Sequence, residues 1–356
     1  MTNAMNGMTQ QFHYQGMVDP SQPALAEEAP KERNGEPTQA DPPIFIFGIA
    51  RRSGTNFLFQ LLLLHKACFA GEVVLEDFFL AHADLLERYT NAVYHSWDRT
   101  WQAKLASPNL LLSHLGQGLI SFLIAEAKRT SNVSVQEENR GKRVVTKTPS
   151  VQNLARCFEL FPTVKPIVIV RDGRAVVESG VRSFRRNYED AAHEWATAAV
   201  EIQSLLATQP ADHYLLVRYE DLQQDTEAQM RKILRFLDLD PADYDFAAMR
   251  DLPIFGSSQI VSEGQQRVHW GGNTFENFDP NKRWQDWDQA LHERFNRIAG
   301  AAMTELGYTL QPNRTPQPFR FVRLTWYTLR WHLWKRVRPV QKFVWRQWAK
   351  VKRLVR

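Results

Sequence analysis

The sequence predicts an α/β fold, a three-layer sandwich in which helices cover both faces of a central parallel sheet. Segments 44–47 and 164–173 contain continuously apolar runs, which are typical of strands that a parallel sheet buries on both faces. Segments with helical spacing alternate with the predicted strands, and the chain contains no internal repeat. With 356 residues, of which 44% are hydrophobic, the chain is long enough for one large domain with appendages.

The first strand leads into a cationic turn, IFIFGIARRSGTNFLFQLL at 44–62. Gly48 and Gly54 allow backbone geometry that other residues disfavour and let a ligand approach closely. If a helix begins near Ser53, its free N–H groups and positive dipole end point into the turn. Positive charge and further donors come from Arg51, Arg52, Ser53, Thr55 and Asn56. The unit predicts a phosphate-binding loop; the alternative is an ordinary joint with solvated arginines.

This loop differs from that of the nucleotide triphosphatases. Their motif spaces two glycines as G-x-x-x-x-G and continues with Lys for the phosphates and Ser or Thr for magnesium. Here the glycines are one residue further apart, Thr55 stands at the place of the lysine, and the cations precede Ser-Gly. The histidines and the two cysteines show no metal-ligand spacing. We therefore expect a phosphate ligand bound without a metal.

The other elements follow in order along the chain. Apolar residues at three-to-four spacing predict helices at 80–93, 109–130, 151–161, 174–184, 190–207, 228–239 and 291–308. Short apolar runs predict further strands at 143–147 and 213–222. Thr226 and Gln229 form the pattern of a capping box at the start of the helix at 228–239.

The strand within 164–173 predicts a second cation at the same edge of the sheet. Arg171 ends this strand, and ligands of open α/β sheets bind at the carboxyl ends of strands. Ser179 follows eight residues later, in the next predicted helix. Whether the two side chains meet depends on how that helix folds back. A loop arginine and a core-facing serine are the alternative.

Charge and composition divide the chain into three parts. The net charge is +5, but residues 319–356 alone contain twelve Lys or Arg and no Asp or Glu. Residues 1–42 are polar and lack the charged start and apolar centre of a secretory signal, which predicts a disordered leader. The predicted parts are this leader, a folded domain at 43–312 and a basic Trp-rich tail at 313–356. Two cysteines far apart in sequence indicate a reducing, cytoplasmic compartment.

These features resemble the sulfotransferases that use 3′-phosphoadenosine-5′-phosphosulfate (PAPS), in particular their bacterial branch. Segment 51–56 is similar to their 5′-phosphosulfate motif, commonly P-R-S-G-T-T or P-K-S-G-T-T, although Arg replaces Pro and Asn the second Thr. Arg171 and Ser179 are similar to their 3′-phosphate motif. The resemblance spans roughly residues 44–310 and also includes KTPS at 147–150, RYEDL at 218–222, NKRW at 281–284 and LGY at 306–308.

The resemblance implies a P-loop-like fold, PAPS as co-substrate and no metal. It implies that the 5′-phosphosulfate is bound by Arg51, Arg52, Ser53, Gly54, Thr55 and Asn56. Arg171 and Ser179 would bind the 3′-phosphate, and Arg283 with Lys282 would close over the nucleotide. Sulfuryl transfer builds negative charge on the leaving phosphate bridge, so that fixed cations such as Arg52 lower the barrier.

The acceptor requires a base, and AGEVVLEDFF at 70–79 supplies the candidates. A carboxylate at this place resembles the catalytic glutamate of several branches. Glu72 is the first choice, Glu76 the second and Asp77 the third; a solvated carboxylate cluster is the alternative. Lys147 is a candidate to hold the transferring sulfuryl group. His65 and His114 are weaker candidates for the base, for which a packing role is favoured.

The segment 319–356 predicts a basic amphipathic helix with five tryptophans. Its predicted apolar face consists of Phe321, Leu324, Tyr327, Trp331 and Trp334. Pro339 should bend or divide the helix. Such a helix lies at the surface of an anionic membrane, so we expect a peripheral protein on the cytoplasmic face. Nucleic acid and a partner protein are the rival ligands, and the tryptophans favour the membrane.

Three function classes fit the sequence. The first is a PAPS-dependent sulfotransferase acting on a hydroxyl or amine, with a lipid, lipid-linked or envelope-carbohydrate acceptor suited to the tail. The second is a P-loop kinase or nucleotide hydrolase, which the missing lysine disfavours and magnesium-dependent ATP turnover would reveal. The third is a non-catalytic, membrane-bound relative that binds the nucleotide without transfer. Aromatic and acidic residues at 72–105 are candidates to line the acceptor site. The alternative is that they belong to the hydrophobic core.

Overall fold

The computed structural model describes residues 42–354, apart from 72–73, 106, 108, 130–138, 140, 253–257, 263–264, 270–280 and 282. For 128–129, 258–262, 265–269 and 338–354 only the backbone is described. The predicted leader, except for Pro42, therefore lies outside the described residues, as do Glu72 and Lys282.

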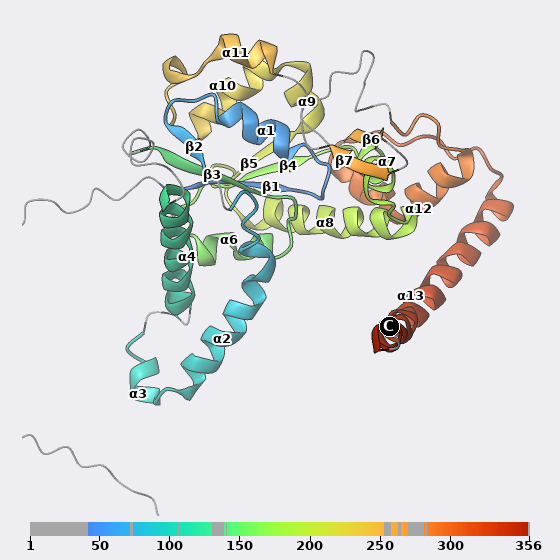
Figure 1. Ribbon diagram of the computed structural model, residues 1–356, viewed down its shortest axis with the longest axis horizontal. Helices are drawn as coiled ribbons and strands as arrows, with labels where there is room; N and C mark the ends of the chain where they lie inside the picture. Colours follow the sequence, from blue (N-terminus) through green and yellow to red (C-terminus); the bar gives the residue numbers. More distant parts are fainter. Residues whose placement is uncertain are drawn as a thin grey trace, which may run out of the picture. The chain divides into compact units, whose positions relative to one another are not determined.

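A five-stranded parallel sheet with the order β2-β3-β1-β4-β5 forms the centre of the domain (Figure 1). Its strands are β1 (Ile44–Gly48), β2 (Cys68–Ala70), β3 (Arg143–Thr148), β4 (Ile167–Val170) and β5 (Leu215–Arg218). The register pairs Ile46 of β1 with Lys147 on one side and with Ile167 on the other. The carboxyl end of β1 therefore lies between those of β3 and β4.

Helices cover both faces of this sheet, which confirms the predicted α/β fold with a parallel sheet. Alternate residues of β1 point to opposite faces: Phe45 and Phe47 join one buried cluster, and Ile44 and Ile46 join the other. The Phe cluster includes residues of α4, α6, α7, α8 and α12, whereas the Ile cluster includes residues of α1, α9, α10 and α11. In Figure 1 the two helical layers lie below and above the sheet.

The longer helices of the described residues agree with the apolar spacing of the sequence. They are α1 (Thr55–Leu62), α2 (Ala83–Ser96), α4 (Asn109–Arg129), α7 (Gly173–Phe184), α8 (Tyr188–Thr208), α10 (Thr226–Phe236), α12 (Gln289–Glu305) and α13 (Gln317–Leu354). Short helices are α3 (Arg99–Gln102), α6 (Cys157–Leu160), α9 (Tyr219–Gln224) and α11 (Phe246–Asp251), with 3₁₀ turns at Leu80–His82, Leu154–Arg156 and Pro241–Asp243.

Several sequence predictions of local structure were wrong. The helix expected at 151–161 is only a 3₁₀ turn followed by α6. The strand expected at 213–222 ends at Arg218, where the chain turns into α9. Asp225, and not Thr226, caps α10, since its side chain accepts from the Ala228 N–H. The edge strand β2 and the hairpin of β6 (Ser258–Ser262) and β7 (Gln265–His269) were not predicted.

The helix α4 is apolar and long enough, by length and composition, to cross a membrane over Asn109–Ala127. It nevertheless packs on the domain, because Leu112, Ile120 and Leu123 are buried in the cluster that covers the Phe face of the sheet. α4 lies very close to Leu160 at Gly116, because a Cβ at this position would lie 1.7 Å from the carbonyl oxygen of Leu160. The contact needs a residue without a side chain.

We expect Gly116→Ala to lower the free energy of unfolding by about 1–3 kcal/mol, because the added methyl group must displace the backbone of α6. Gly118 lies in the same helix, but a Cβ there would meet no atom within 4 Å. Gly118→Ala should therefore stabilise the protein by about 0.5–1 kcal/mol through helix propensity alone. Denaturant unfolding of the two variants checks this; equal effects would contradict the packing of α4 on α6.

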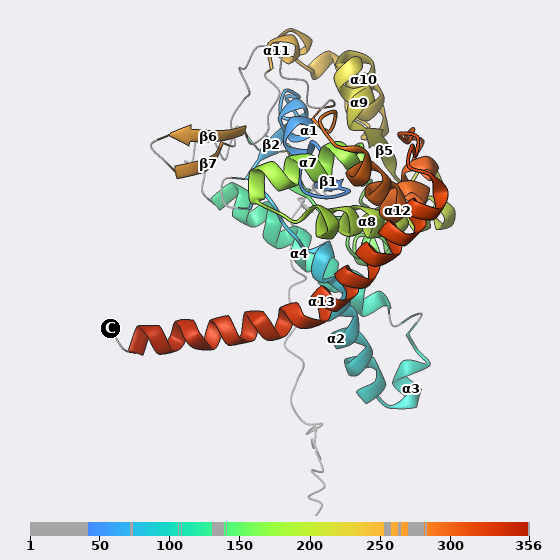
Figure 2. The ribbon, with the colours of Figure 1, turned by 90° about the vertical axis from the view of Figure 1, so that its right-hand side faces the viewer.

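The C-terminal segment forms one helix, α13, from Gln317 to Leu354, so Pro339 does not divide it. Figure 2 shows that the helix changes direction along its length, and a proline inside a helix bends it by removing one backbone N–H from the hydrogen-bond ladder.

Candidate active site

The loop after β1 joins the strand to α1 through two left-handed backbone positions. Arg52 has a φ of 81° and Gly54 a φ of 102°. Gly54 also lacks room for a side chain, because a Cβ would lie 2.2 Å from the ring of Tyr219. Gly54 is the residue before α1 and provides no side-chain cap, so the first-turn N–H groups of α1 keep their capacity to bind a ligand.

The loop also places hydroxyl and amide groups beside these N–H groups. Ser53 is fully buried, and its Oγ has no hydrogen-bond partner among the described residues. Thr55 is buried at the first position of α1, Asn56 is half-buried, and Arg51 is exposed. A buried hydroxyl without a partner costs free energy, so the loop is arranged for a group that brings hydrogen-bonding atoms.

Three arginines from distant parts of the chain converge on this loop. Arg52 Nε donates to Ser179 Oγ at 2.8 Å, and Arg283 Nη1 donates to the same oxygen at 3.2 Å. Arg171, at the end of β4, donates from Nη1 to the carbonyl oxygen of Arg52 at 2.8 Å. Ser179 lies in α7, so the helix after β4 does fold back toward the first loop. The two predicted phosphate motifs thus form one cationic site.

Burial and mutual repulsion lower the pKa values of two of these arginines. Burial, together with repulsion from Arg283 and Arg171, lowers the pKa of Arg52 to about 9. Burial and repulsion from Arg171 and Arg182 lower the pKa of Arg283 to about 10. Both groups remain charged at neutral pH. A multiply charged anion between them would offset the repulsion and stabilise the site.

Tyr219 and Glu220 support the site, although neither role was predicted from the sequence. The guanidinium of Arg171 lies 4.4 Å from the centre of the Tyr219 ring, where a cation is attracted by the ring face. Glu220 accepts from the Asp172 N–H at 2.9 Å and from the Tyr308 hydroxyl at 3.0 Å. Both residues directly follow β5. Their position at the carboxyl edge of the sheet, where ligands of such folds bind, could have indicated these roles.

Lys147 lies at the end of β3, beside β1, and is buried. Its Nζ forms an ion pair with Glu76 Oε1 at 2.7 Å. The Glu76 side chain is 36% exposed, so the pair has one face toward solvent. Glu76, the second candidate for the base, thus contacts Lys147, the residue predicted to hold the transferring sulfuryl group.

Asp77 has a different environment from Glu76. It accepts from Thr146 Oγ1 at 2.9 Å and from the Phe79 N–H at 3.0 Å, which attaches the segment after residue 74 to β3. Burial raises the pKa of Asp77, although these hydrogen bonds oppose the rise. These contacts fix Asp77, the neighbour of Glu76 in sequence, against β3.

The other candidate residues lie apart from the arginine site or outside the described residues. His65 is buried, with Nε2 2.9 Å from the carbonyl oxygen of Asp240 and Nδ1 accepting from the Ala67 N–H. His114 is exposed on α4. The placements of Glu72 and Lys282 are not described. Within the described part of the chain, no group of three or more His, Cys, Asp or Glu could hold a metal ion.

Comparisons with known proteins bear on this site. Residues 42–243 match the sulfotransferase family, described by that name. Protein-tyrosine sulfotransferase A of Caenorhabditis elegans is 27% identical over 209 residues, which cover 56% of this chain and 51% of the relative. The chain thus spans about half the length of this relative.

Solved structures show weaker likeness over more of the chain. A sulfotransferase domain from the Synechococcus PCC 7002 olefin synthase is 21% identical, with a TM-score of 0.44, and the match covers 77% of this chain and 98% of that domain. A retinol dehydratase, solved in a complex with retinol and PAP, is 14% identical with a TM-score of 0.35, and the match covers 76% of this chain and 83% of that one.

Proposed function

The chain belongs to the sulfotransferase family, and on this premise we propose that it transfers the sulfuryl group of PAPS to a hydroxyl or amine of an acceptor. The observation that carries the proposal is the single cationic site formed by Arg52, Arg171 and Arg283 around Ser179. This site combines a cation from the loop after β1 with a cation at the end of β4. It can therefore bind a ligand that carries two separate anionic groups.

The geometry of the site supports binding of both anionic groups of PAPS. The 5′-phosphosulfate would lie on the first turn of α1, where Ser53, Thr55 and Asn56 add donors to the free N–H groups. The 3′-phosphate would lie between Arg171 and Ser179, with Arg283 and Lys282 closing over the nucleotide. The lowered pKa values of Arg52 and Arg283 support the fit, because bound phosphate would offset the repulsion that lowers them.

When bound, PAPS supplies a sulfuryl group on a phosphate leaving group. In this proposal Arg52 and the N–H groups of α1 hold the negative charge that develops on the bridging oxygen as the bond from sulfur to that oxygen breaks. Lys147 lies at the end of the neighbouring strand and holds the sulfuryl oxygens. The acceptor oxygen or nitrogen forms the new bond to sulfur and passes its proton to a carboxylate, Glu72 as first choice and Glu76 as second.

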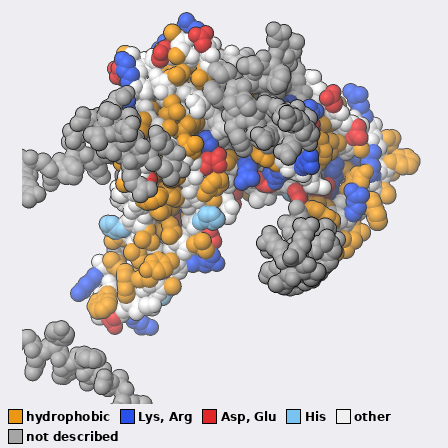
Figure 3. Space-filling view, in the orientation of Figure 1, with side chains coloured by type: hydrophobic (Ala, Val, Ile, Leu, Met, Phe, Trp, Pro, Cys, Tyr) orange, Lys and Arg blue, Asp and Glu red, His pale blue; other side chains and the backbone are white. Residues whose placement is uncertain are grey.

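We propose that the acceptor is a lipid, a lipid-linked sugar or an envelope carbohydrate, reached from the cytoplasm. Exposed apolar side chains on α2 and α4, such as Leu85, Tyr89 and Phe122, support an acceptor with an apolar part. Figure 3 shows hydrophobic side chains gathered over these helices, at the lower left. Both cysteines are buried free thiols, which is consistent with a reducing compartment.

The nucleotide assignment predicts a selective loss in the variant Arg171→Ala. Its affinity for PAP should fall by about 10- to 100-fold, because a charge-assisted contact to the 3′-phosphate is lost. Adenosine 5′-phosphosulfate lacks that phosphate, so it should bind the wild type weakly and the variant equally weakly. Arg231→Ala, which removes an exposed arginine paired with Glu227, is the matched control and should bind both ligands normally. Titration calorimetry measures the four affinities. Equal losses for both ligands would show that Arg171 does not bind the 3′-phosphate.

Transfer itself is tested by supplying labelled PAPS and the protein to membrane and soluble extracts and identifying the labelled product. We expect a sulfated product in the membrane extract. Binding of PAPS without any labelled product would favour a non-catalytic relative, and magnesium-dependent turnover of ATP would favour a kinase or hydrolase.

A further inference from the structure

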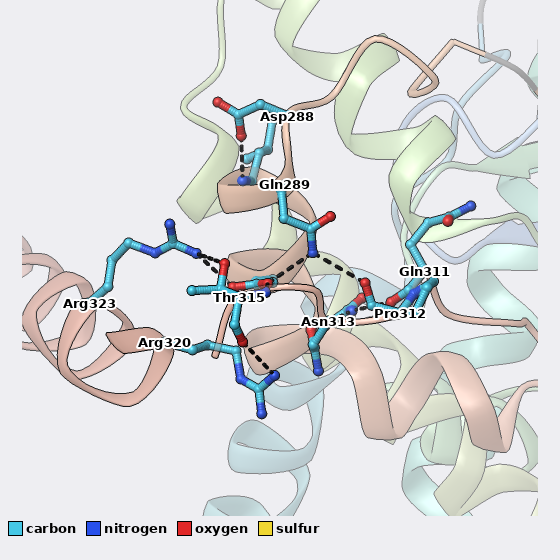
Figure 4. Close-up of polar contacts among 11 residues, drawn as sticks. Asp288, Gln289, Gln311, Pro312, Asn313, Thr315, Arg320 and Arg323 are labelled. Carbon is cyan, nitrogen blue, oxygen red and sulfur yellow. Dashed lines mark hydrogen bonds and ion pairs between the residues drawn. The ribbon is translucent and has the colours of Figure 1, made fainter. Parts of the chain in front are cut away.

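The inner face of α13 is attached to the domain by polar contacts. Arg323 Nη2 forms an ion pair with Glu293 Oε2 of α12 at 2.6 Å, and Arg294 Nη1 of α12 donates to Thr328 Oγ1 at 2.8 Å. Figure 4 shows Arg320 and Arg323 directed toward Thr315, in the segment before α13. The first half of α13 is therefore held in a defined orientation on α12.

The carboxylate of Glu293 is the acidic partner in this attachment. Its side chain is fully buried, and burial by itself would raise its pKa. Hydrogen bonds from Gln289 and Thr315, with the charge of Arg323, instead lower the pKa to about 2. Glu293 stays ionised under all physiological conditions, so the ion pair with α13 persists.

The apolar face expected from the sequence is mostly half-buried. Leu324, Tyr327, Trp331 and Trp334 are half-buried, whereas Phe321 is 68% exposed. Trp331 stacks on His193 of α8, with the ring centres 3.9 Å apart. These residues contribute to packing of the helix on the domain, and a different set must serve any outside partner.

A second apolar row lies on the outer face of α13. Its members are between 50% and 72% exposed and are Phe319, Val322, Trp326, Leu329, Leu333 and Val337. At 3.6 residues per turn they fall within an arc of about 80° on the helix surface. We call these six residues the outer row. Nothing among the described residues covers it.

Basic residues accompany the outer row. Arg330 and Arg336 are exposed, and helical geometry places them at opposite borders of the row. The segment 319–356 contains no Asp or Glu that would neutralise them. Figure 3 shows hydrophobic and basic side chains together over the first part of α13, at the right.

We propose that the outer row of α13 docks on an anionic membrane surface, with the helix lying along the bilayer and the inner face holding the domain against it. The row enters the boundary between headgroups and acyl chains, and the flanking arginines contact lipid phosphates. A second copy of this helix fits poorly, because pairing two rows brings like charges together. Nucleic acid would engage the arginines but leave the apolar row in water.

The proposal is tested by sedimentation of the full-length protein with vesicles of equal parts phosphatidylcholine and phosphatidylglycerol, and with vesicles of phosphatidylcholine alone. We expect binding to the anionic vesicles that weakens at high salt and is much lower on the neutral ones. The double variant Val322→Asp with Leu329→Asp should lower the partition coefficient of the protein between vesicles and solution by about tenfold or more. Two charges must then enter the apolar layer. Val200→Asp, which places one such charge at an exposed valine of α8, should bind like the wild type.

Affinity for PAP should be the same in all these proteins, which separates loss of membrane binding from misfolding or failure of the proposed chemistry. Three results would overturn the proposal. They are equal vesicle binding by the double variant, a wild-type dimer in solution that the double variant converts to monomer, and a wild type that ignores vesicles but binds DNA.

Discussion

Arg52→Ala should lower both the affinity for PAP and the rate of sulfuryl transfer without destabilising the ligand-free fold. We expect PAP affinity to fall by about 10- to 100-fold, because a charge-assisted contact disappears. The rate at saturating PAPS should fall by about 10²- to 10³-fold, because charge on the leaving oxygen loses its fixed counter-charge. Titration calorimetry and single-turnover transfer measure the two losses.

The thermal stability of this variant provides an independent readout. In the ligand-free protein Arg52 is desolvated and repelled by Arg283 and Arg171, so its charge opposes folding at neutral pH. Removing it should leave the melting temperature unchanged or raise it, while the rise that PAP causes should be smaller than in the wild type. Arg52→Lys keeps the charge but loses the Nε bond to Ser179 and should be intermediate. A variant that melts earlier yet transfers sulfuryl groups normally would show that Arg52 serves the fold and not the ligand.

Glu72→Gln should strongly reduce turnover while it keeps PAP affinity, because the proposed base acts only on the acceptor. Loss of a general base typically costs about 10²- to 10⁴-fold in rate. Glu76→Gln should reduce the rate less, since it removes the ion-pair partner of Lys147 and not the base. The measurement is the single-turnover rate at saturating PAPS as a function of pH.

The pH profile distinguishes the two carboxylates. A base must be ionised, so the wild-type rate should fall as the pH drops through the pKa of the base. This acid limb should be absent from the residual activity of Glu72→Gln and retained in Glu76→Gln. If Glu72→Gln keeps full activity and Glu76→Gln loses the acid limb, then Glu76 is the base and the first choice was wrong.

Local chemistry made the fold class and the two groups of candidate anion-binding residues predictable. A continuously apolar segment such as 44–47 indicates burial on both faces, and a glycine with hydroxyl and basic residues after it indicates an anion-binding turn. Both inferences concern neighbours in sequence. The rule that parallel strands end at one edge then placed Arg171 near the first loop without knowledge of any contact.

Contacts between distant residues required the tertiary structure. Arg52 and Ser179 are 127 residues apart, and only the path of α7 back across the end of β4 brings them within 2.8 Å. The ion pair of Lys147 with Glu76 depends on how the segment after residue 74 lies on β3. Apolar spacing likewise predicted α13 as a helix with an apolar face, but it did not show that four of the five residues of that face would be half-buried. Periodicity reports which residues of one element lie on a common side, whereas the packing of that element on the others determines which side solvent or a partner can reach.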